Sequence, residues 1–431
     1  MHWNKKFECM PLDQLKAFQL KNLKKTVAWV FDKVPFYTRK FKKLGISAND
    51  LKHIDDISKL PFTVKNDLRD NYPFGLCALP MDDIIGIHAS SGTTGTPITN
   101  VYTQADLDQW AECVARNLWA YGVRKKDIVQ NAYGYGLFTG GLGLHYGLLK
   151  IGCSIIPTSS GITERQVKLL KDFKPTALCS TPSYALTIAE KAEEMNIDIR
   201  KLPLKIGIFG AEPWTREMCS AIEERMGITA LNIFGLTEMC GPGVGYECSV
   251  GQNGSHINED HFIAEILDTK TFKPVPMGEK GELVFTSIQR QAMPLIRYRT
   301  KDITRFIPEK CSCGRTFVKI DRIFGRTDDM LIISGVNIFP SQIESFLFDI
   351  KEVDPQYRLI VRKKGYLDKL IVQVEARQEV YDKGEETRKQ VEAKINSHIK
   401  DNIGISVDVN LVKPKFIGRS LGKAVRVVDE R

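Results

Sequence analysis

The chain has 431 residues, of which 43% are hydrophobic and 26% are charged, and its formal net charge is +9. This is the composition of a globular protein of two or three domains, and it excludes a disordered or fibrous chain. No run approaches 18 apolar residues, so the sequence predicts no membrane-spanning helix and no membrane association. The positive charge is interspersed with acidic residues, which favours a solvated surface compatible with anionic small molecules. No nucleic-acid-binding motif accompanies it.

The N-terminus and the ten cysteines predict a cytoplasmic protein. The first residues, 1–6, are not followed by the apolar stretch of a secretory signal. In a reducing cytoplasm, cysteines remain thiols or bind metals rather than forming disulfides.

Apolar residues at helical spacing predict helix over residues 12–47. From about 84 to 210, short apolar runs alternate with helical segments. Strands are expected at 84–89, 129–132, 154–157, 177–180 and 205–210, with a helix at about 141–151. This alternation predicts a mostly parallel, layered α/β core. Ligands bind beyond the carboxyl ends of strands in such sheets, which is where the Gly-rich turns of this segment fall.

The pattern changes after residue 262. Alternating apolar residues over 262–267 and 282–286 predict antiparallel strands. After Gly325 a smaller unit begins, with strand 330–333, helix 341–350, strands 357–364 and 369–376, helix 382–402 and strand 406–412. We therefore expect a large N-terminal α/β domain, residues 1–325, and a small α+β C-terminal domain, residues 326–431.

The segment Ser90–Pro97 places hydroxyls, backbone amides and two glycines in one turn. Successive backbone amides can converge on an anion, and glycines let the backbone approach phosphate oxygens closely. The pattern favours a phosphate-binding loop, although Ser/Thr/Gly surface turns are common. It lacks the Gly-Lys-Ser/Thr ending of a Walker A loop.

Several motifs then follow one another along the whole chain: Ser90–Pro97, Gly210–Trp214, Phe234–Glu238, Tyr298–Asp302, Gly325–Asp329 and Gly422–Lys423. The series resembles the adenylate-forming superfamily of acyl-CoA synthetases. Within it, Leu60–Thr63, Asn71–Gly75, Tyr133–Gly141 and Gly241–Val244 resemble the phenylacetate–CoA ligase family. The resemblance implies that ATP and a carboxylate form an acyl-adenylate and pyrophosphate, and that coenzyme A then displaces AMP. It also implies that the C-terminal domain rotates between the two steps.

The resemblance assigns ATP-binding residues. It places Ser90, Ser91, Gly92, Thr93, Thr94 and Gly95 at the β- and γ-phosphates, and Gly210, Ala211, Glu212, Pro213, Phe234 and Gly235 at the AMP moiety. Thr237 would contact the α-phosphate and Glu238 would ligate Mg²⁺, which prefers oxygen donors. Asp302 would accept both ribose hydroxyls. Arg326 would also reach the ribose or a phosphate.

The C-terminal part has its own expected residues. Asp328 matches the hinge of the family, and Gly335 would lie near the coenzyme A channel. Lys423 would bridge the substrate carboxylate and the α-phosphate, where it stabilises developing charge, so Lys423, Thr237 and Glu238 are the expected catalytic residues. Without the family context, a solvated tail lysine would be the simpler interpretation of Lys423.

The expected substrate is an aryl acid, with phenylacetate first. Tyr135, Phe138, Gly140 and Gly141 match the segment that borders the acyl site in this family. The two glycines are expected to leave room for a flat ring, and aromatic walls favour an aryl group. The alternative is that Tyr135 and Phe138 are simply core residues. One departure is Thr96, which stands where the family has a lysine. We expect it to weaken ATP binding or slow the first step.

Cys248, His256, Cys311 and Cys313 form a separate set. Three thiolates and one imidazole suit a closed, tetrahedral structural zinc, and sequences like phenylacetate–CoA ligase carry a similar set. The alternative is a dithiol with a spectator histidine. Because four protein ligands leave no open position, a catalytic zinc is not expected.

Three further interpretations stay open. The enzyme could load a carrier-protein thiol instead of coenzyme A, or the protein could bind an acyl-adenylate or coenzyme A without catalysis, for which Thr96 is the only support. A homodimer is implied by the family resemblance alone.

Overall fold

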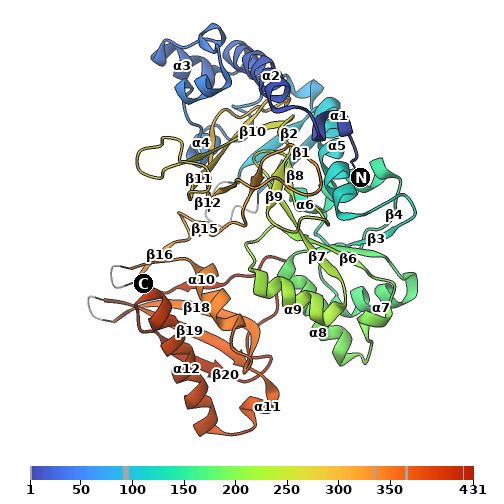
Figure 1. Cartoon of the computed structure of the whole chain (residues 1–431), viewed down its shortest axis with the longest axis vertical. Helices are drawn as coiled ribbons and strands as arrows, with labels where there is room; N and C mark the ends of the chain where they lie inside the picture. The colour runs from blue at the N-terminus through green and yellow to red at the C-terminus, as the bar shows by residue number, and fades with distance from the viewer. Residues whose placement is uncertain (1, 91–96, 334–335, 365–366, 421) are drawn as a thin grey trace.

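The computed structural model describes residues 2–90, 97–333, 336–364, 367–420 and 422–431. A large N-terminal lobe forms the upper part of the molecule in Figure 1, and a small C-terminal lobe hangs below it. Buried apolar residues from Leu331 to Leu411 form the core of the small lobe. The predicted pairing of a large α/β domain with a small α+β domain is confirmed.

The main sheet has nine strands within the described ranges. Its parallel half consists of β4 (Ser154–Ile156), β3 (Ile128–Asn131), β5 (Ala177–Ser180), β6 (Ile206–Gly210) and β7 (Thr229–Leu236). Its antiparallel half continues through β8 (Gly241–Tyr246), β9 (Ser255–Ile257), β14 (Lys319–Ile320) and β13 (Phe306–Ile307). The four parallel strands predicted from 129 to 210 are confirmed. Every residue of β5 is buried, as expected where helices cover both faces of a parallel sheet.

Helices pack on the two faces of this sheet. They are α5 (Gln104–Tyr121), α6 (Thr139–Ile151), α7 (Thr163–Phe173), α8 (Pro182–Glu194) and α9 (Arg216–Met226). Helices α5 and α6 contact each other and β8, whereas α8 packs between α7 and α9. Thr103 starts α5 by accepting the amide of Asp106, and Gly122 ends it in the left-handed conformation at φ 104°.

The strand expected at 84–89 exists, but its expected place is wrong. Strand β1 (Gly86–Ala89) pairs with β2 (Thr99–Tyr102) in an antiparallel ribbon outside the main sheet. Ile87 is 46% exposed, so this apolar strand is only partly covered by the rest of the protein. The ribbon ends at the segment that the sequence predicts to bind phosphate.

A second sheet contains β10 (Phe262–Leu267), β11 (Gly281–Ser287), β12 (Tyr298–Thr304) and β15 (Gly325–Arg326). The predicted antiparallel pairing of the first two strands is confirmed. The N-terminal helix expected at 12–47 is two helices, α2 (Leu12–Lys33) and α3 (Pro35–Leu44), because Pro35 disfavours helical geometry at the residue before it. The short helices α1 (Lys5–Glu8) and α4 (Lys65–Asp70) flank them in sequence.

The C-terminal lobe contains a sheet in the order β20 (Asp408–Val412), β19 (Leu367–Ala376), β18 (Val353–Lys364) and β21 (Val427–Asp429). Its helices are α10 (Pro340–Phe348), α11 (Gln378–Tyr381) and α12 (Glu385–Ile403), and a hairpin joins β16 (Leu331–Ile333) to β17 (Val336–Ile338). The predicted order of elements is confirmed, and β17, α11 and β21 are additions.

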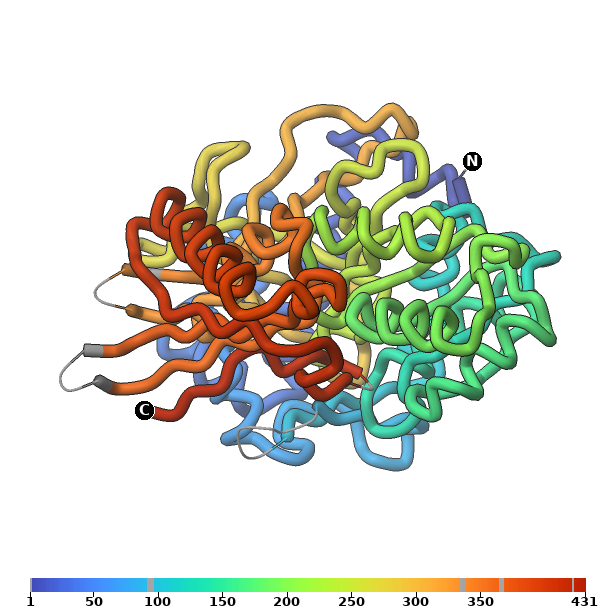
Figure 2. Tube along the Cα trace, turned by 90° about the horizontal axis from the view of Figure 1, so that it is seen from below, coloured from blue at the N-terminus to red at the C-terminus, as the bar shows by residue number. Residues whose placement is uncertain are grey.

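The domain boundary at 325/326 stays a prediction. Strand β15 pairs with β12, so Arg326 belongs to a sheet of the N-terminal lobe. Seen from below, the C-terminal lobe lies across the N-terminal lobe beside the helices of residues 182–226 (Figure 2). Helix α10 contacts α9, and Phe348 packs against the hydrophobic core that α8 and α9 share.

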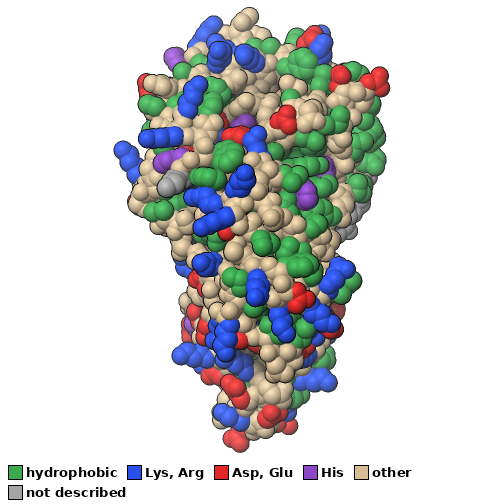
Figure 3. Space-filling model, turned by 90° about the vertical axis from the view of Figure 1, so that its right-hand side faces the viewer, with side chains coloured by type: hydrophobic (Ala, Val, Ile, Leu, Met, Phe, Trp, Pro, Cys, Tyr) green, Lys and Arg blue, Asp and Glu red, His purple; other side chains and the backbone are tan. Residues whose placement is uncertain are grey.

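One face of the molecule shows how its charged side chains are distributed. On the face shown in Figure 3, Lys and Arg side chains are scattered rather than gathered in one patch, and acidic side chains lie among them on the lower lobe. Among the helices in the described part of the chain, none is long and apolar enough to cross a membrane.

Candidate active site

The C-terminal tail docks on the N-terminal lobe on both sides of Lys423. The Thr181 hydroxyl donates to the carbonyl of Gly422 at 3.0 Å, and the amide of Ala424 donates to Glu212 Oε2 at 2.8 Å. Lys423 Nζ lies 5.1 Å from the centre of the Phe138 ring. The structure therefore brings together predicted residues from three distant segments, namely the acyl-site, AMP-site and lysine motifs.

The ammonium group of Lys423 lies in a site where charges oppose one another. Desolvation lowers the pKa of Lys423, and the carboxylates of Glu212 and Glu238 act against that shift. Arg326 adds to the lowering. Because the residue keeps solvent access, we read this as a cation near two carboxylates rather than as a neutral amine.

Glu212 is fixed by the helix that follows β5. Its Oε1 accepts the amide of Ser183 at 2.8 Å and also the Ser183 hydroxyl. Ala211, one residue earlier, adopts a left-handed conformation at φ 73°, which is unusual for a residue with a side chain and is typical of functional turns. Pro213 and Trp214 continue this turn, and the Trp214 indole donates to Asn232 Oδ1 at 2.8 Å.

Two predicted AMP-site glycines are required by strand packing. A Cβ on Gly210 would lie 2.1 Å from the carbonyl oxygen of Ile233, and one on Gly235 would lie 1.9 Å from that of Gly241. Any side chain here would separate β6 from β7 or β7 from β8. The glycine at each position is therefore explained by the sheet itself, whatever each contributes to the nucleotide.

The segment with Thr237 and Glu238 connects β7 to β8. The Tyr298 hydroxyl donates to Glu238 Oε1 at 3.0 Å, and Asn100 Nδ2 donates to the carbonyl of Thr237 at 2.5 Å. Thr237 itself is buried. Phe234 lies at the end of β7 and packs at 6.1 Å from the ring of Phe285.

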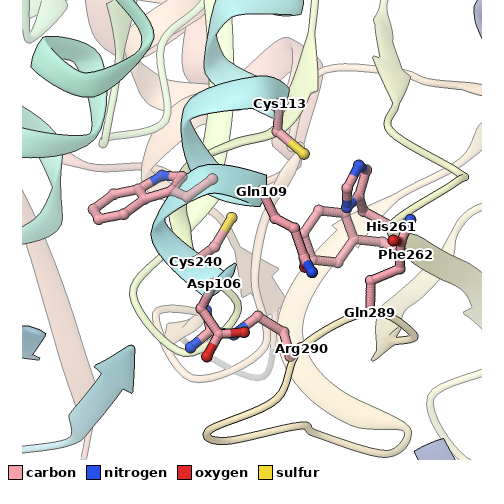
Figure 4. A pocket seen from close by; sticks show the side chains of 9 residues that line it. Asp106, Gln109, Cys113, Cys240, His261, Phe262, Gln289 and Arg290 are labelled. Carbon is pink, nitrogen blue, oxygen red and sulfur yellow. The ribbon is translucent and has the colours of Figure 1, made fainter. Parts of the chain in front are cut away.

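Arg290 binds the backbone of this segment and the side chain of Asn100. Its guanidinium donates to the carbonyl of Met239 at 2.7 Å and to Asn100 Oδ1 at 2.9 Å. Asp106, shown beside Arg290 in Figure 4, lies 3.6 Å from Arg290 Nε. Sequence reasoning missed Arg290 and Asn100, because neither belongs to a recognisable motif. The cavity that Figure 4 shows is about 10 Å³, which is the size of one water molecule and too small for a substrate.

Asp302, Arg326 and Asp328 form one ion-pair group. Arg326 Nη1 donates to Asp302 Oδ1 at 2.8 Å, and Nε donates to Asp328 Oδ1 at 3.0 Å. Desolvation raises the pKa of Asp302 to about 6, against the attraction of Arg326. The residue expected at the ribose is thus linked through one guanidinium to the residue expected at the hinge.

The predicted acyl residues lie at the start of α6. Tyr135 and Phe138 are partly exposed, which argues against a purely core role. Asn131 Nδ2 donates to the Tyr135 hydroxyl at 2.8 Å, and burial raises the pKa of Tyr135 to about 12. His145 Nδ1 lies 3.1 Å from the same hydroxyl.

The two glycines of this segment do not leave open space in the structure. A Cβ on Gly140 would lie 2.7 Å from the Phe138 ring, and one on Gly141 would lie 2.6 Å from the carbonyl oxygen of Gly134. These glycines admit the protein's own loop against α6. The expectation that they leave room for a substrate ring is therefore wrong, because protein atoms fill that space.

Part of the predicted site lies outside the described residues. This applies to Ser91, Gly92, Thr93, Thr94, Gly95 and Thr96 of the phosphate loop and to Gly335. Ser90 is described, and its hydroxyl accepts the amide of Ile98 at 3.0 Å while its own amide donates to the Ile98 carbonyl. Ser90, the described residue at the start of the predicted phosphate loop, is thus held against Ile98.

The four predicted zinc ligands gather at one place in the N-terminal lobe. The donor atoms of Cys248, His256, Cys311 and Cys313 all lie within 4.8 Å of one another. The Cys248 and Cys311 sulfurs are 3.5 Å apart, and Cys313 Sγ lies 3.4 Å from His256 Nε2. The other ring nitrogen, Nδ1, lies 3.1 Å from the Phe317 carbonyl and donates to it when protonated, which leaves Nε2 to face the thiols.

Comparison with known proteins identifies the family. Residues 26–292 match the AMP-binding enzyme family, and residues 335–431 match the AMP-binding enzyme C-terminal domain. A phenylacetate–coenzyme A ligase of Pseudomonas putida is 47% identical over 424 residues, which span 98% of this chain and 96% of the relative. The chain belongs to the phenylacetate–coenzyme A ligase family of AMP-binding enzymes. The resemblance stated from the motifs is confirmed.

Solved structures add the arrangement of the lobes. A 2-hydroxyisobutyryl-CoA ligase in the postadenylation state matches with a TM-score of 0.95 and 29% identity, over 100% of this chain and 92% of that chain. The same ligase in the thioesterification state, over the same shares and at 30% identity, gives a TM-score of 0.75. The two lobes of this ligase are therefore arranged much as in the postadenylation state of that enzyme.

Proposed function

We propose that this ligase adenylates phenylacetate with ATP and transfers the phenylacetyl group to coenzyme A. In the first step a carboxylate oxygen attacks the α-phosphorus and pyrophosphate leaves. In the second, the coenzyme A sulfur attacks the acyl carbon and AMP leaves. One observation carries the proposal: the residues on either side of Lys423 dock on the large lobe, Gly422 on Thr181 and Ala424 on Glu212. The lobes are arranged as in the postadenylation state of a related ligase.

Several residues have separate roles in the first step. Lys423 stabilises the charge that develops between the carboxylate and the α-phosphate, since a cation prepositioned in a partly desolvated site acts most strongly there. Thr237 binds the α-phosphate, and Asp302 accepts the ribose hydroxyls once it has lost its proton. The backbone after Ser90 holds the β- and γ-phosphates.

Glu238 suits Mg²⁺, which ATP carries into the site. It is a hard oxygen donor, and the Tyr298 hydroxyl orients one of its oxygens at 3.0 Å. Arg290 and Asn100 fix the backbone on both sides of it. The metal would supply charge neutralisation on the phosphates.

The Cys/His set fits a structural zinc. Three thiols and an imidazole nitrogen within 4.8 Å make the ligand set of a closed tetrahedral site. The backbone amide of Gly251 donates to Cys248 Sγ at 3.2 Å and helps to hold that sulfur in place. Cys248, His256, Cys311 and Cys313 would hold the ion, which joins the segment after β8 to the one between β13 and β14.

Coenzyme A, a carrier-protein thiol and a non-catalytic binding role lead to different results. The test is pyrophosphate release with ATP and Mg²⁺ over phenylacetate, substituted phenylacetates, indoleacetate, benzoate and short fatty acids, with and without coenzyme A. Turnover on phenylacetate that depends on coenzyme A supports the proposal. Pyrophosphate release without thioester formation points to a carrier thiol. Silence from folded protein with every acid favours the non-catalytic role and makes Thr96→Lys the next variant.

Two expectations from the sequence stay predictions. They are the homodimer and the cytoplasmic localisation. The first is checked by sedimentation of the purified protein, and the second by fractionation of the cells that produce it.

A further inference from the structure

Arg419 forms an ion pair with each lobe. It stands four residues before Lys423, in a tail segment without helix or strand. Its Nε and Nη2 bind the two carboxylate oxygens of Glu190 at 2.7 and 2.8 Å. Its Nη1 and Nη2 bind those of Glu375 at 2.7 and 2.9 Å. Bidentate pairs of this kind fix geometry as well as charge.

The two carboxylates differ in what else they do. Glu375 lies on β19, is 1% exposed, and also accepts the amides of Lys415 and Ile417 at 2.9 and 2.7 Å. It therefore ties Arg419 to the C-terminal lobe itself. Glu190 lies on α8 of the N-terminal lobe and is 22% exposed. A rotation of the small lobe would carry Arg419 and Glu375 together and leave Glu190 behind.

Helix α8 also holds the tail at its other end. Thr181, which caps the start of α8, binds the Gly422 carbonyl at 3.0 Å. The nine residues from Thr181 to Glu190 span roughly 13 Å of helix, so the two contacts lie well apart along α8. Arg419 and Gly422 are thus each attached to α8, immediately before Lys423.

We propose that Glu190 is a positioning residue for the first half-reaction, which holds Arg419 and through it places Lys423. This rests on the proposed function, because it assigns Lys423 to adenylation. Glu190 touches neither substrate in this scheme. Its contribution belongs to the lobe arrangement that forms the adenylate, and it ends when the small lobe turns for thioester formation.

The same helix supplies a matched control. Glu194 pairs with Lys415 of the tail, but these side chains are 33% and 60% exposed. Exposed pairs of this kind contribute little. Glu190→Gln and Glu194→Gln each remove one acidic charge from α8 at a contact with the tail, and only the first breaks the pair with Arg419. Glu190→Asp keeps the charge on a shorter side chain.

The first measurement needs no substrate. Hydrogen exchange of the full-length protein reports how firmly residues 418–426 are docked, since the Ala424 amide is protected by Glu212. We expect exchange to be several-fold faster in Glu190→Gln and unchanged in Glu194→Gln. Exchange in Glu190→Gln equal to that of the wild type would overturn the proposal, even if no carboxylate were ever turned over.

The second measurement separates the half-reactions. Loss of a charged hydrogen-bond partner corresponds to roughly a 10- to 100-fold change, and we expect this loss in single-turnover pyrophosphate release by Glu190→Gln. Thioester formation from supplied phenylacetyl-adenylate and coenzyme A should stay within about twofold, and Glu190→Asp should recover part of the first rate. Equal loss in both steps, at an unchanged unfolding temperature, would overturn the proposal. A wild type silent on every acid would instead contradict the proposed function and leave the exchange result to decide the docking.

Discussion

The adenylation site and the Cys/His cluster are built in opposite ways. Lys423 comes from the tail of the small lobe, whereas Glu212 and Asp302 come from the large lobe, so the proposed site depends on how the two lobes are arranged. The cluster takes all four donors from the large lobe, and the Phe317 carbonyl orients its histidine. Motion that reorganises the first region should leave the second unchanged.

The difference follows from what holds each region. Contacts across the lobes include the packing of Phe348 on the core of α8 and α9, but the tail beside Lys423 is held by hydrogen bonds and ion pairs, such as Arg419 with Glu190. The cluster is fixed by β9 and β14, which pair directly beside His256. The first region is therefore suited to conformational change and the second to holding two loops together.

The largest effect is expected at Lys423. Lys423→Ala should reduce single-turnover pyrophosphate release by roughly 10²- to 10³-fold, because the transition state of the first step loses a positioned cation that stabilises its negative charge. Thioester formation from supplied phenylacetyl-adenylate should be spared. Lys415→Ala is the control, since Lys415 is an exposed lysine of the same tail. Equal loss in both half-reactions would contradict the proposed role.

Breaking the cluster should act on the whole enzyme rather than on one step. Cys313→Ser is expected to lower zinc content and the unfolding temperature, and to reduce both half-reactions together, because metal binding contributes to folding. Elemental analysis and thermal unfolding measure the first two. Cys77→Ser replaces a thiol that is also partly exposed but lies outside the cluster. Full zinc content and stability in Cys313→Ser would exclude the assigned metal site.

Asn100 tests whether the large-lobe half of the active site is preformed. Asn100→Ala removes the donor to the Thr237 carbonyl and one acceptor of Arg290, which keeps the carbonyls of Met239 and Val101. A change at Arg290 would instead leave the buried Asp106 without its cationic partner. We expect roughly a tenfold loss in the first half-reaction, with more Mg²⁺ needed for half-maximal rate. Titration with Mg²⁺ measures this. Lower stability at an unchanged Mg²⁺ requirement would show that Asn100 acts only on folding.

The sequence predicted features that depend on neighbouring residues, and it missed those that depend on contacts between distant segments. Short motifs predicted Glu212, Asp302 and Lys423 as site residues, and periodicity correctly predicted the parallel strands, because both signals are local in sequence. The residues that support the site lie outside any recognisable motif: Glu190 on a helix, Asn100 on a strand and Arg290 in a loop. Only the folded structure shows which residues they contact. The place of β1 was wrong for a related reason, since its apolar residues do not reveal which strand it pairs with.

The smallest expected effect is a pH dependence at Asp302. Desolvation raises the pKa of Asp302 from the ordinary value of 3.8 to about 6 in the folded protein. Between about pH 4 and pH 6, Asp302 is therefore protonated in the folded protein and ionised in the unfolded chain. The stability from this group is present below pH 4 and is lost as the pH rises through 6. Binding of ribose hydroxyls needs the carboxylate, so AMP affinity should increase over the same rise, roughly tenfold from pH 5 to 7. The phosphate of AMP titrates near this range too, so the wild type is compared with two variants. Asp302→Asn should lose the part of the pH dependence that comes from the protein. Asp328→Asn, which changes a more exposed partner of Arg326, should keep it. Identical pH profiles for the wild type and Asp302→Asn would show that Asp302 does not bind the nucleotide, and would leave Arg326 as the residue proposed to bind the ribose.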